Sequence, residues 1–248
     1  INLVIMLLIV IGGIGFLTWD DFCTNKWNLK RYRLQSKIIL VTTAVLILLP
    51  AIFFFLSDFA GFSMGKRILA SFFQSVTLRT AGFNTADLGA MNDSSKAIMT
   101  LMMLIGGSPG STAGGMKTTT IAVLILNAFA TFGREPETEV FGRRFDNTVV
   151  KNAATIAILY FFLFFAGGIA ISQIEHIALS DCLFETASAV GTAGLTLGIT
   201  TELGLVSHLI LVVLMYLGRV GGLTLIYAAI SVKIQSGAKR PLDKITVG

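Results

Sequence analysis

The chain of 248 residues is 54% hydrophobic and 13% charged, with a net charge of +5 and a mean hydropathy of +0.80. Soluble globular domains carry about 25% charged residues, so this composition indicates a membrane protein with several spans and excludes an ordinary soluble enzyme. The two cysteines, Cys23 and Cys182, are far apart and form neither a disulfide framework nor a cysteine metal motif.

Long apolar runs predict the membrane-spanning helices. The chain opens in such a run, residues 1–18, without the basic start and cleavage site of a signal peptide, and we expect a preceding part of the protein. Runs of about 18 or more apolar residues predict spans over 38–57, 152–173 and 206–232. The stretch 96–132 is also long enough for a span, but a glycine-rich segment interrupts it.

Two shorter segments, 66–90 and 176–200, lie between these spans. Each has a moderately apolar half followed by a tail rich in glycine and threonine. Their apolar halves are too short to cross a bilayer. They predict re-entrant pore helices, each followed by an irregular strand.

Two kinds of internal repeat organise the chain. "FQSVTLRTAGF" (73–83) matches "FETASAVGTAGL" (184–195) when one residue is inserted before Thr-Ala-Gly, and glycine clusters recur at 11–15, 105–110 and 217–222. The sequence therefore predicts an all-α membrane protein of repeated units around a central pore. The predicted division is a last helix of an incomplete repeat (1–18), a cytoplasmic linker (19–37), a complete repeat (38–132), a second linker (133–151), a second complete repeat (152–232) and a cytoplasmic tail (233–248).

The distribution of charge predicts the orientation. Thirteen of the 19 lysines and arginines lie in the two linkers and the tail, which the positive-inside rule places in the cytoplasm. The re-entrant segments then enter from outside, where carboxylates gather that either attract cations or form a solvated face: Asp58, Asp87, Asp93, Glu175, Asp181 and Glu202.

The two Thr-Ala-Gly segments are the candidate ion filter: Thr80, Ala81, Gly82, Thr192, Ala193 and Gly194. Non-helical backbone within a membrane survives only where it is buried in protein or lines a watery path. Extended backbone here would point carbonyl oxygens at a monovalent cation and replace its hydration shell. The alternative for each segment is close packing of small residues between helices.

The glycine-rich segment nearly spells a phosphate-binding loop, but its lysine is out of register by one and its flanks are membrane-like. We interpret it instead as a break in a helix that acts as a flexible gate, with a passive kink or an ion-coordinating break of a transporter as alternatives. Its residues are Gly106, Gly107, Ser108, Pro109, Gly110, Ser111, Thr112, Ala113, Gly114, Gly115 and Lys117.

Three cationic residues lie within or beside the membrane segments, where charge indicates function. We expect Arg219 to face the pathway close to the broken helix, as a tether or an electrostatic barrier. For Arg79 we favour a structural ion pair with Glu185. Lys117 is ambiguous, and one interpretation is a snorkelling side chain at the inner end of the loop.

Four segments, "TLRTAGFNT", "GGSPGSTAGGMKTTT", "ETASAVGTAGLTLG" and "YLGRVGGLTL", resemble the Trk/Ktr/HKT superfamily of potassium transporters, and most closely its bacterial KtrB-type membrane subunits. The resemblance covers essentially the whole chain. It implies four M1-P-M2 repeats (helix, re-entrant pore helix with filter, helix) around one pore. This chain would supply repeats three and four and the last helix of repeat two.

The resemblance also implies roles for particular residues. Gly82 and Gly194 would be filter glycines with K⁺ bound at the carbonyls of Thr80, Gly82, Thr192 and Gly194, residues 106–117 would be the gating loop, and Arg219 the pore arginine. A homodimer in the bacterial plasma membrane would sit on a cytosolic RCK-type (KtrA-like) ring. ATP or ADP would bind that ring and not this chain, and Na⁺ is a possible activator in the family.

We therefore predict a potassium-conducting membrane subunit that is not an enzyme and binds no nucleic acid. The alternatives are a sodium-conducting or sodium-coupled relative, a secondary transporter with its ion site in the broken helix, and a structural scaffold. A membrane enzyme or pump would need a nucleotide site or an acid–base pair, whereas His176 and His208 stand isolated in the sequence.

Overall fold

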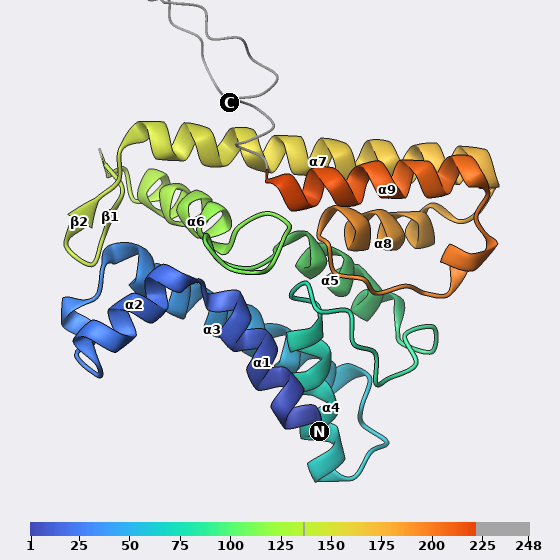
Figure 1. Cartoon of the computed structure of the whole chain (residues 1–248), viewed down its shortest axis with the longest axis horizontal. Coiled ribbons are helices and arrows are strands. Elements are labelled where there is room, and N and C mark those ends of the chain that lie inside the picture. The colour runs from blue at the N-terminus through green and yellow to red at the C-terminus, as the bar shows by residue number, and fades with distance from the viewer. Residues whose placement is uncertain (136, 222–248) are drawn as a thin grey trace, which may run out of the picture.

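The computed structural model describes residues 1–135 and 137–221, and these residues form mostly helices (Figure 1). This confirms that the protein is mainly helical, as predicted. The elements are α1 (Asn2–Ile14), α2 (Phe16–Asn25), a 3₁₀ turn (Leu29–Arg31), α3 (Leu34–Ser57), α4 (Met64–Thr77), α5 (Asp93–Leu104), α6 (Thr118–Phe132), β1 (Glu139–Val140), β2 (Arg143–Arg144), α7 (Asn147–Glu175), α8 (Leu179–Val190), a second 3₁₀ turn (Ile199–Glu202) and α9 (Leu205–Val220).

Two helices in the described part of the chain, α3 and α7, are long and apolar enough to cross a bilayer. Both begin a few residues before the predicted spans, at Leu34 and Asn147. At the start of α7 the carboxylate of Asp146 accepts a hydrogen bond from the backbone N–H of Thr148 at 3.0 Å, which lowers the pKa of that carboxyl. Large apolar side chains on both helices are exposed, as expected of surfaces that face lipid.

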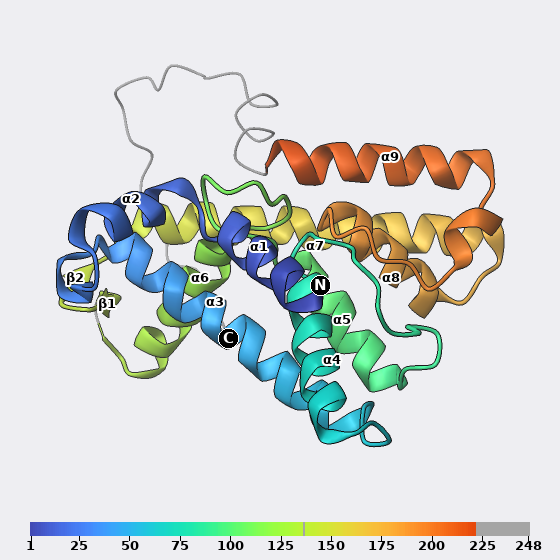
Figure 2. The same ribbon diagram turned by 60° about the horizontal axis from the view of Figure 1, so that its bottom comes forward.

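The short helices pack against the long ones in a repeated order. α4 lies on α3, α8 lies on α7, and α9 covers both α7 and α8 (Figures 1 and 2). Contact between α5 and α8 joins the two groups. Phe54, Met103, Tyr160 and Phe184 are among the fully buried side chains of the shared core. The irregular segments after α4 and α8 begin next to this core, with Leu78, Ala193 and Leu195 buried in it.

The prediction of one helix over residues 1–18 was wrong. The chain bends by 94° between α1 and α2 at Gly15. Gly15 has φ 91° and ψ 147°, and a Cβ atom there would lie 2.5 Å from the backbone oxygen of Pro109, so only glycine fits. The indole N–H of Trp19 on α2 donates to the backbone oxygen of Ile11 on α1 at 3.0 Å, and this bond across the bend stabilises it.

The predicted break in the stretch 96–132 is confirmed, because α5 ends at Leu104 and α6 begins only at Thr118. The predicted span 206–232 is helical from Leu205 to Val220, and its remainder lies outside the described residues, as does the predicted tail 233–248. Within the predicted linker 133–151, β1 and β2 form a short antiparallel hairpin.

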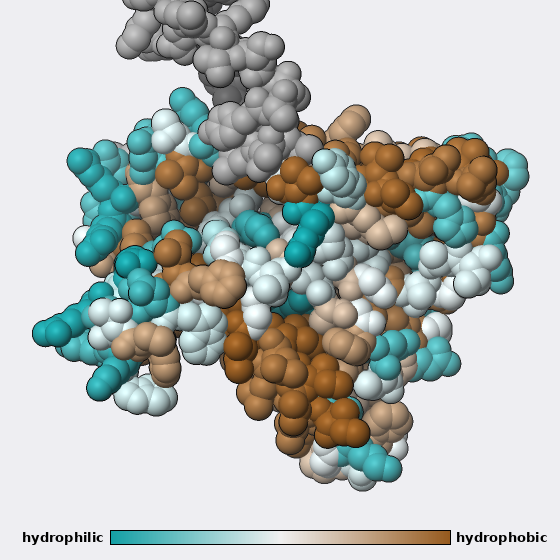
Figure 3. All heavy atoms as spheres, in the orientation of Figure 1, coloured by the Kyte–Doolittle hydropathy of each residue, from teal (hydrophilic) through white to brown (hydrophobic). Residues whose placement is uncertain are grey.

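The surface of the described residues separates apolar from polar regions. A continuous apolar patch covers α1 (Figure 3), where the exposed residues are Leu3, Val4, Leu7, Leu8 and Ile11. Hydrophilic side chains gather around the hairpin and the link between α2 and α3. This separation is typical of helices that face lipid or further helices between two aqueous ends.

Candidate functional site

The two Thr-Ala-Gly segments, although far apart in sequence, touch in the folded chain. A Cβ atom built at Gly82 would lie 2.6 Å from the backbone oxygen of Ala193 and 3.2 Å from the Cα atom of Gly194. No side chain fits at Gly82 without displacing the backbone of the other segment. Close approach therefore requires glycine at this position.

The backbone of the two segments has the same unusual conformation. Thr80 has φ 57° and Gly82 φ 72°, while Thr192 has φ 53° and Gly194 φ 86°. Ala81 and Ala193 between them lack positive φ. A threonine at positive φ is strained by about 1–3 kcal/mol, and such strain persists only where the surrounding structure imposes it. Alternation of φ in this way turns successive carbonyls toward one side, as a row of cation ligands requires.

Each segment is anchored to the last turn of the helix before it. The N–H groups of Ala81 and Gly82 donate to the oxygen of Thr77 at 3.3 and 3.4 Å. In the second copy the N–H of Ala193 donates to the oxygen of Ser188 at 2.8 Å, and that of Gly194 to the Ser188 hydroxyl at 3.1 Å.

The buried Glu185 on α8 holds the irregular residues 195–200, which follow the second Thr-Ala-Gly segment. Its carboxylate accepts hydrogen bonds from the hydroxyls of Thr196 and Thr200, the latter at 2.8 Å, and from the N–H of Leu197 at 3.2 Å. This role of Glu185 was not predicted from the sequence. The threonines that follow the second Thr-Ala-Gly segment, Thr196 and Thr200, are the sequence feature that could have indicated donors for a buried carboxylate.

The predicted ion pair between Arg79 and Glu185 is wrong. The Arg79 guanidinium turns to the glycine-rich loop, where Nη2 donates to the backbone oxygen of Gly106 at 3.4 Å. Its Nε atom is buried and has no hydrogen-bond partner among the described residues. The carboxylate of Glu185 instead accepts its hydrogen bonds from the irregular residues that follow Gly194.

The loop between α5 and α6 has a closed, buried neck. The N–H of Gly106 donates to the oxygen of Met116 at 2.8 Å, and the N–H of Met116 to that of Leu104 at 3.1 Å. The hydroxyls of Ser108 and Thr118 lie 3.1 Å apart inside the neck. These bonds satisfy backbone groups that the broken helix would otherwise leave unpaired within the membrane.

The tip of the loop is held by the other two glycine clusters of the sequence. Its Ser108 N–H donates to the oxygen of Gly13 at 2.9 Å, and the N–H of Phe16 donates to the loop oxygen of Gly110 at 3.1 Å. On the other side, the N–H of Gly115 donates to the oxygen of Gly218 in α9 at 3.1 Å. The three clusters recognised as a repeat thus converge at one place.

The loop also lies against the second Thr-Ala-Gly segment. A Cβ atom at Gly114 would lie 2.2 Å from the hydroxyl oxygen of Thr192, so loop backbone and threonine side chain are in direct contact. The Thr192 hydroxyl is buried and has no hydrogen-bond partner in the described part of the chain. A movement of the loop must therefore change the surroundings of Thr192.

The three membrane-embedded cations all donate to backbone oxygens of this loop. Besides Arg79, Lys117 donates through Nζ to Ala113 at 2.7 Å, and Arg219 donates through Nη1 to Thr112. Lys117 is half-buried, and its side chain folds back over the loop to reach Ala113. Among the described residues none of the three forms an ion pair with a carboxylate.

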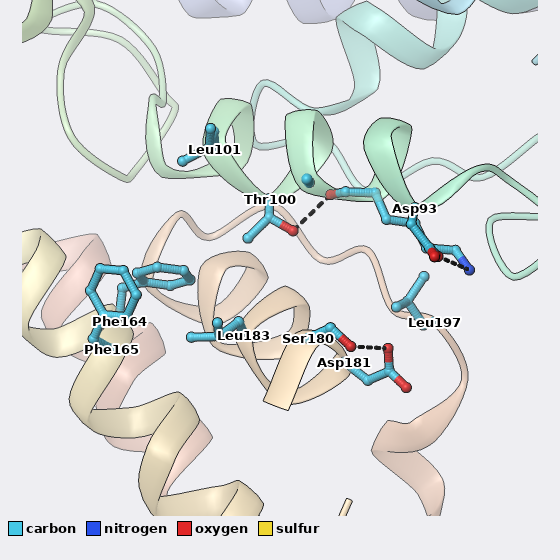
Figure 4. Close-up of a pocket in the computed structure, with 11 residues that line it drawn as sticks. Asp93, Thr100, Leu101, Phe164, Phe165, Ser180, Asp181, Leu183 and Leu197 are labelled. Atoms are coloured by element: carbon cyan, nitrogen blue, oxygen red, sulfur yellow. Dashed lines mark hydrogen bonds and ion pairs between the residues drawn. The ribbon is translucent and has the colours of Figure 1, made fainter. Parts of the chain in front are cut away.

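A cavity of about 530 Å³ connects several of these groups. It extends from Glu185 and Thr200, past Thr192 and Gly194, to Arg219. A second cavity, of about 500 Å³, lies between α5, α7 and α8 (Figure 4). Residues of neither Thr-Ala-Gly segment nor of the loop line the second cavity, and its Ser180 and Asp181 bond to each other at 3.2 Å. The first cavity is therefore the candidate site.

The sequence matches the model of the TrkH family, described as cation transport protein, over residues 1–238. It is 33% identical to the Ktr system potassium uptake protein B of Bacillus subtilis over 254 residues, and 34% identical to the potassium/sodium uptake protein NtpJ of Enterococcus hirae over 257 residues. These matches cover 100% and 99% of this chain but 57% of each relative. The chain thus spans little more than half the length of either relative.

The fold is similar to the crystal structure of the potassium transporter TrkH from Vibrio parahaemolyticus. The TM-score is 0.75 at 21% sequence identity, and the match covers 92% of this chain and 52% of that one.

Proposed function

The chain belongs to the TrkH family of cation transport proteins, and on that premise we propose that it forms part of a membrane protein that conducts potassium into the cell through a pore. The observation that carries the proposal is the direct contact between Gly82 and the segment Ala193–Gly194. Two irregular segments with matching backbone that touch each other within a membrane protein suit the lining of an ion path.

We propose that the carbonyl oxygens of Thr80, Gly82, Thr192 and Gly194 bind K⁺ within this path. The matching positive φ values of these four residues support the assignment. A row of carbonyls replaces the hydration shell of a monovalent ion without a covalent step. Ordering such strained backbone requires anchors, and the bonds to Thr77 and Ser188 supply them.

The loop of residues 106–117 is the proposed gate. Its support is the contact of Gly114 with Thr192, together with the three cationic side chains that hold it. In the closed state the loop and the positive charge of Arg219 would obstruct the inner side of the filter. Opening would require the hydrogen bonds from α1, α2 and α9 to break or rearrange.

Cation flux into proteoliposomes tests the proposed filter. K⁺, Rb⁺ and Na⁺ are compared for the protein and for Gly82→Ser and Gly194→Ser. We expect K⁺ and Rb⁺ to pass in preference to Na⁺, and this preference to fall in both variants, because either serine displaces the neighbouring backbone or strains its own. Gly65→Ser is the matched control, since Gly65 on α4 has open space around it.

If both folded variants keep the preference for K⁺ over Na⁺, Gly82 and Gly194 only allow close packing and do not form a filter. Equal K⁺ and Na⁺ flux in the unaltered protein would favour the second candidate, a sodium-conducting or sodium-coupled relative. The printed name of the Enterococcus relative, a potassium/sodium uptake protein, motivates that candidate. A secondary transporter with its ion site in the loop would instead lose ion binding when the loop is shortened.

We also propose the assembly that the resemblance implies, a homodimer seated on a cytosolic nucleotide-binding ring. Its support is the match to a membrane subunit whose name places it in a Ktr system. Co-purification with a ring protein, and flux that differs between ATP and ADP only when the ring is present, are the expected results. Flux that responds to nucleotide without the ring would contradict the proposal.

A further inference from the structure

Two carboxylates on the predicted outer side, Asp58 and Glu175, occupy equivalent positions in the two repeats. Glu175 is the last residue of α7, and Asp58 directly follows the last residue of α3. Each therefore stands at the end of the long helix with which its repeat begins. Both residues are half-buried, and both carboxylates accept hydrogen bonds from the start of a later helix of the same repeat.

The carboxylate of Asp58 binds the start of α5. Its Oδ1 atom accepts a hydrogen bond from the backbone N–H of Asn92 at 3.0 Å, and its Oδ2 atom accepts one from the hydroxyl of Ser95. Asn92 is the N-cap residue of α5 and forms no cap bond through its own side chain, and Ser95, three positions later, is fully buried. Asp58 therefore supplies an acceptor that the start of this helix needs.

The carboxylate of Glu175 repeats this arrangement at the start of α9. Its Oε1 atom accepts hydrogen bonds from the backbone N–H of Gly204 at 2.9 Å and from the hydroxyl of Ser207. Gly204 is the N-cap residue of α9, and Ser207, again three positions later, is fully buried. In a capping box the residue three positions after the N-cap contributes the acceptor itself. Here both helices have a serine at that position, and the acceptor comes from the end of the long helix.

The bonds of Asp58 and Glu175 to the starts of α5 and α9, the two clamps, each join the ends of a pore segment. The backbone groups that they reach are 34 and 29 positions away along the chain. The first clamp encloses residues 59–91, with α4 and the first Thr-Ala-Gly segment, and the second encloses residues 176–203, with α8 and the second Thr-Ala-Gly segment. Joining the ends of a segment restricts the conformations of the chain between them.

We propose that Asp58 and Glu175 are positioning residues of the filter, which act through the hydrogen bonds of the clamps and not through attraction of cations by their charge. The positive φ values of Thr80 and Thr192 persist only where the surrounding structure imposes them, and the clamps contribute to that restraint. The effect on ion selectivity rests on the proposed function, whereas the clamps themselves do not.

Neutralising the two carboxylates separates hydrogen bonding from charge. Glu175 accepts both of its bonds on Oε1, so Glu175→Gln keeps the acceptor that Gly204 and Ser207 use. Asp58 accepts on both oxygens, so Asp58→Asn loses an acceptor on one side. The clamps therefore predict unequal effects of two substitutions that remove the same charge, whereas attraction of cations predicts equal effects.

Ser95→Ala and Ser207→Ala remove a donor from each clamp and leave every charge unchanged. In proteoliposomes with the full-length protein, we expect these two variants and Asp58→Asn each to lower the ratio of K⁺ to Na⁺ flux about threefold or more, because each loses a hydrogen bond of a clamp. Glu175→Gln and the matched control Ser94→Ala, at an exposed serine beside Ser95, are expected to keep the ratio within about twofold. A loss in Glu175→Gln equal to that in Asp58→Asn would overturn the proposal in favour of cation attraction.

Hydrogen exchange of the same proteins, measured by mass spectrometry, tests the clamps without ion flux. We expect Ser95→Ala to raise the exchange rate about threefold or more in residues 78–92, and Ser207→Ala to do so in residues 191–204, each in its own segment only. Unchanged exchange would overturn the clamps, and raised exchange with an unchanged flux ratio would overturn their role in the filter. If the unaltered protein shows no preference for K⁺, the proposed function fails, and the exchange rates alone decide on the clamps.

Discussion

The Arg219 side chain on α9 donates a hydrogen bond to the backbone oxygen of Thr112, more than 100 positions earlier in the chain. This bond connects the last described helix to the tip of the glycine-rich loop. Arg219 also lies at one end of the cavity that passes Thr192 and Gly194. One side chain therefore contributes both a contact that holds the loop and a positive charge in the candidate pathway.

Arg219→Ala is expected to raise K⁺ flux in proteoliposomes, because it removes a tether of the loop and a positive barrier together. A hydrogen bond to a charged group contributes about 1.5–3 kcal/mol when buried, and since Arg219 is exposed we expect an increase of at most about tenfold. Arg219→Lys keeps the charge and serves as the control, with an intermediate flux. If Arg219→Ala protein conducts no more than the unaltered protein, Arg219 is structural.

Deletion of Ser108 to Gly114 should raise flux further and loosen its dependence on a regulatory partner. The deletion removes the bonds from Ser108 to Gly13 and from Phe16 to Gly110, and it takes Gly114 away from Thr192. Flux is compared with and without the ring protein, and thermal unfolding confirms that the variant is folded. Unchanged or abolished flux in a folded variant would rule out the gate.

Arg79→Met offers a separate test of how the loop is held. Arg79 is 8% exposed, and its Nε atom has no partner among the described residues. Replacement of a poorly compensated buried charge by an apolar side chain of similar length is often neutral or stabilising. We expect the melting temperature of the Arg79→Met variant to be unchanged or higher, with flux increased because Gly106 loses a donor. A large fall in melting temperature would show that Arg79 has a stronger anchor than the bond to Gly106.

The parts of the site that could be predicted from the sequence are those with a local signal. Helix cannot continue through a run of glycines with a proline, and the break between Leu104 and Thr118 follows from this. The repeated Thr-Ala-Gly segments predicted that the two segments occupy equivalent positions in the two repeats. Their direct contact at Gly82 and Gly194 depends on tertiary packing and could not be predicted from either copy alone.

Two errors have the same physical origin. Gly15 occurs in a continuous apolar run, and since membrane helices tolerate glycine, the run was predicted as one helix. Its positive φ is imposed by the loop backbone at Pro109, a contact between distant segments. Opposite charge favours Glu185 as the partner of Arg79, whereas in the folded chain Arg79 donates to the backbone oxygen of Gly106 and Glu185 has other donors. The glycine cluster at 11–15, which recurs at the broken helix, is the sequence feature that could have indicated the bend at Gly15.

Glu185→Gln tests whether the irregular residues 195–200 support the proposed filter. One oxygen of the Glu185 carboxylate accepts hydrogen bonds from Thr196 and Leu197, and the other accepts one from Thr200. A glutamine has a single acceptor oxygen, so the acceptor on one of these two sides is lost. We expect a loss of about 1–3 kcal/mol in the free energy of unfolding and a lower preference for K⁺ over Na⁺.

The matched control for that substitution is Glu202→Gln, because Glu202 is exposed at the end of the 3₁₀ turn Ile199–Glu202. It neutralises a carboxylate in the same part of the chain without removing an acceptor of Thr196, Leu197 or Thr200. If the two variants change selectivity equally, the carboxylates act through general attraction of cations at the outer mouth. A loss confined to Glu185→Gln indicates that the geometry of residues 195–200, and through it the position of Gly194, depends on this side chain.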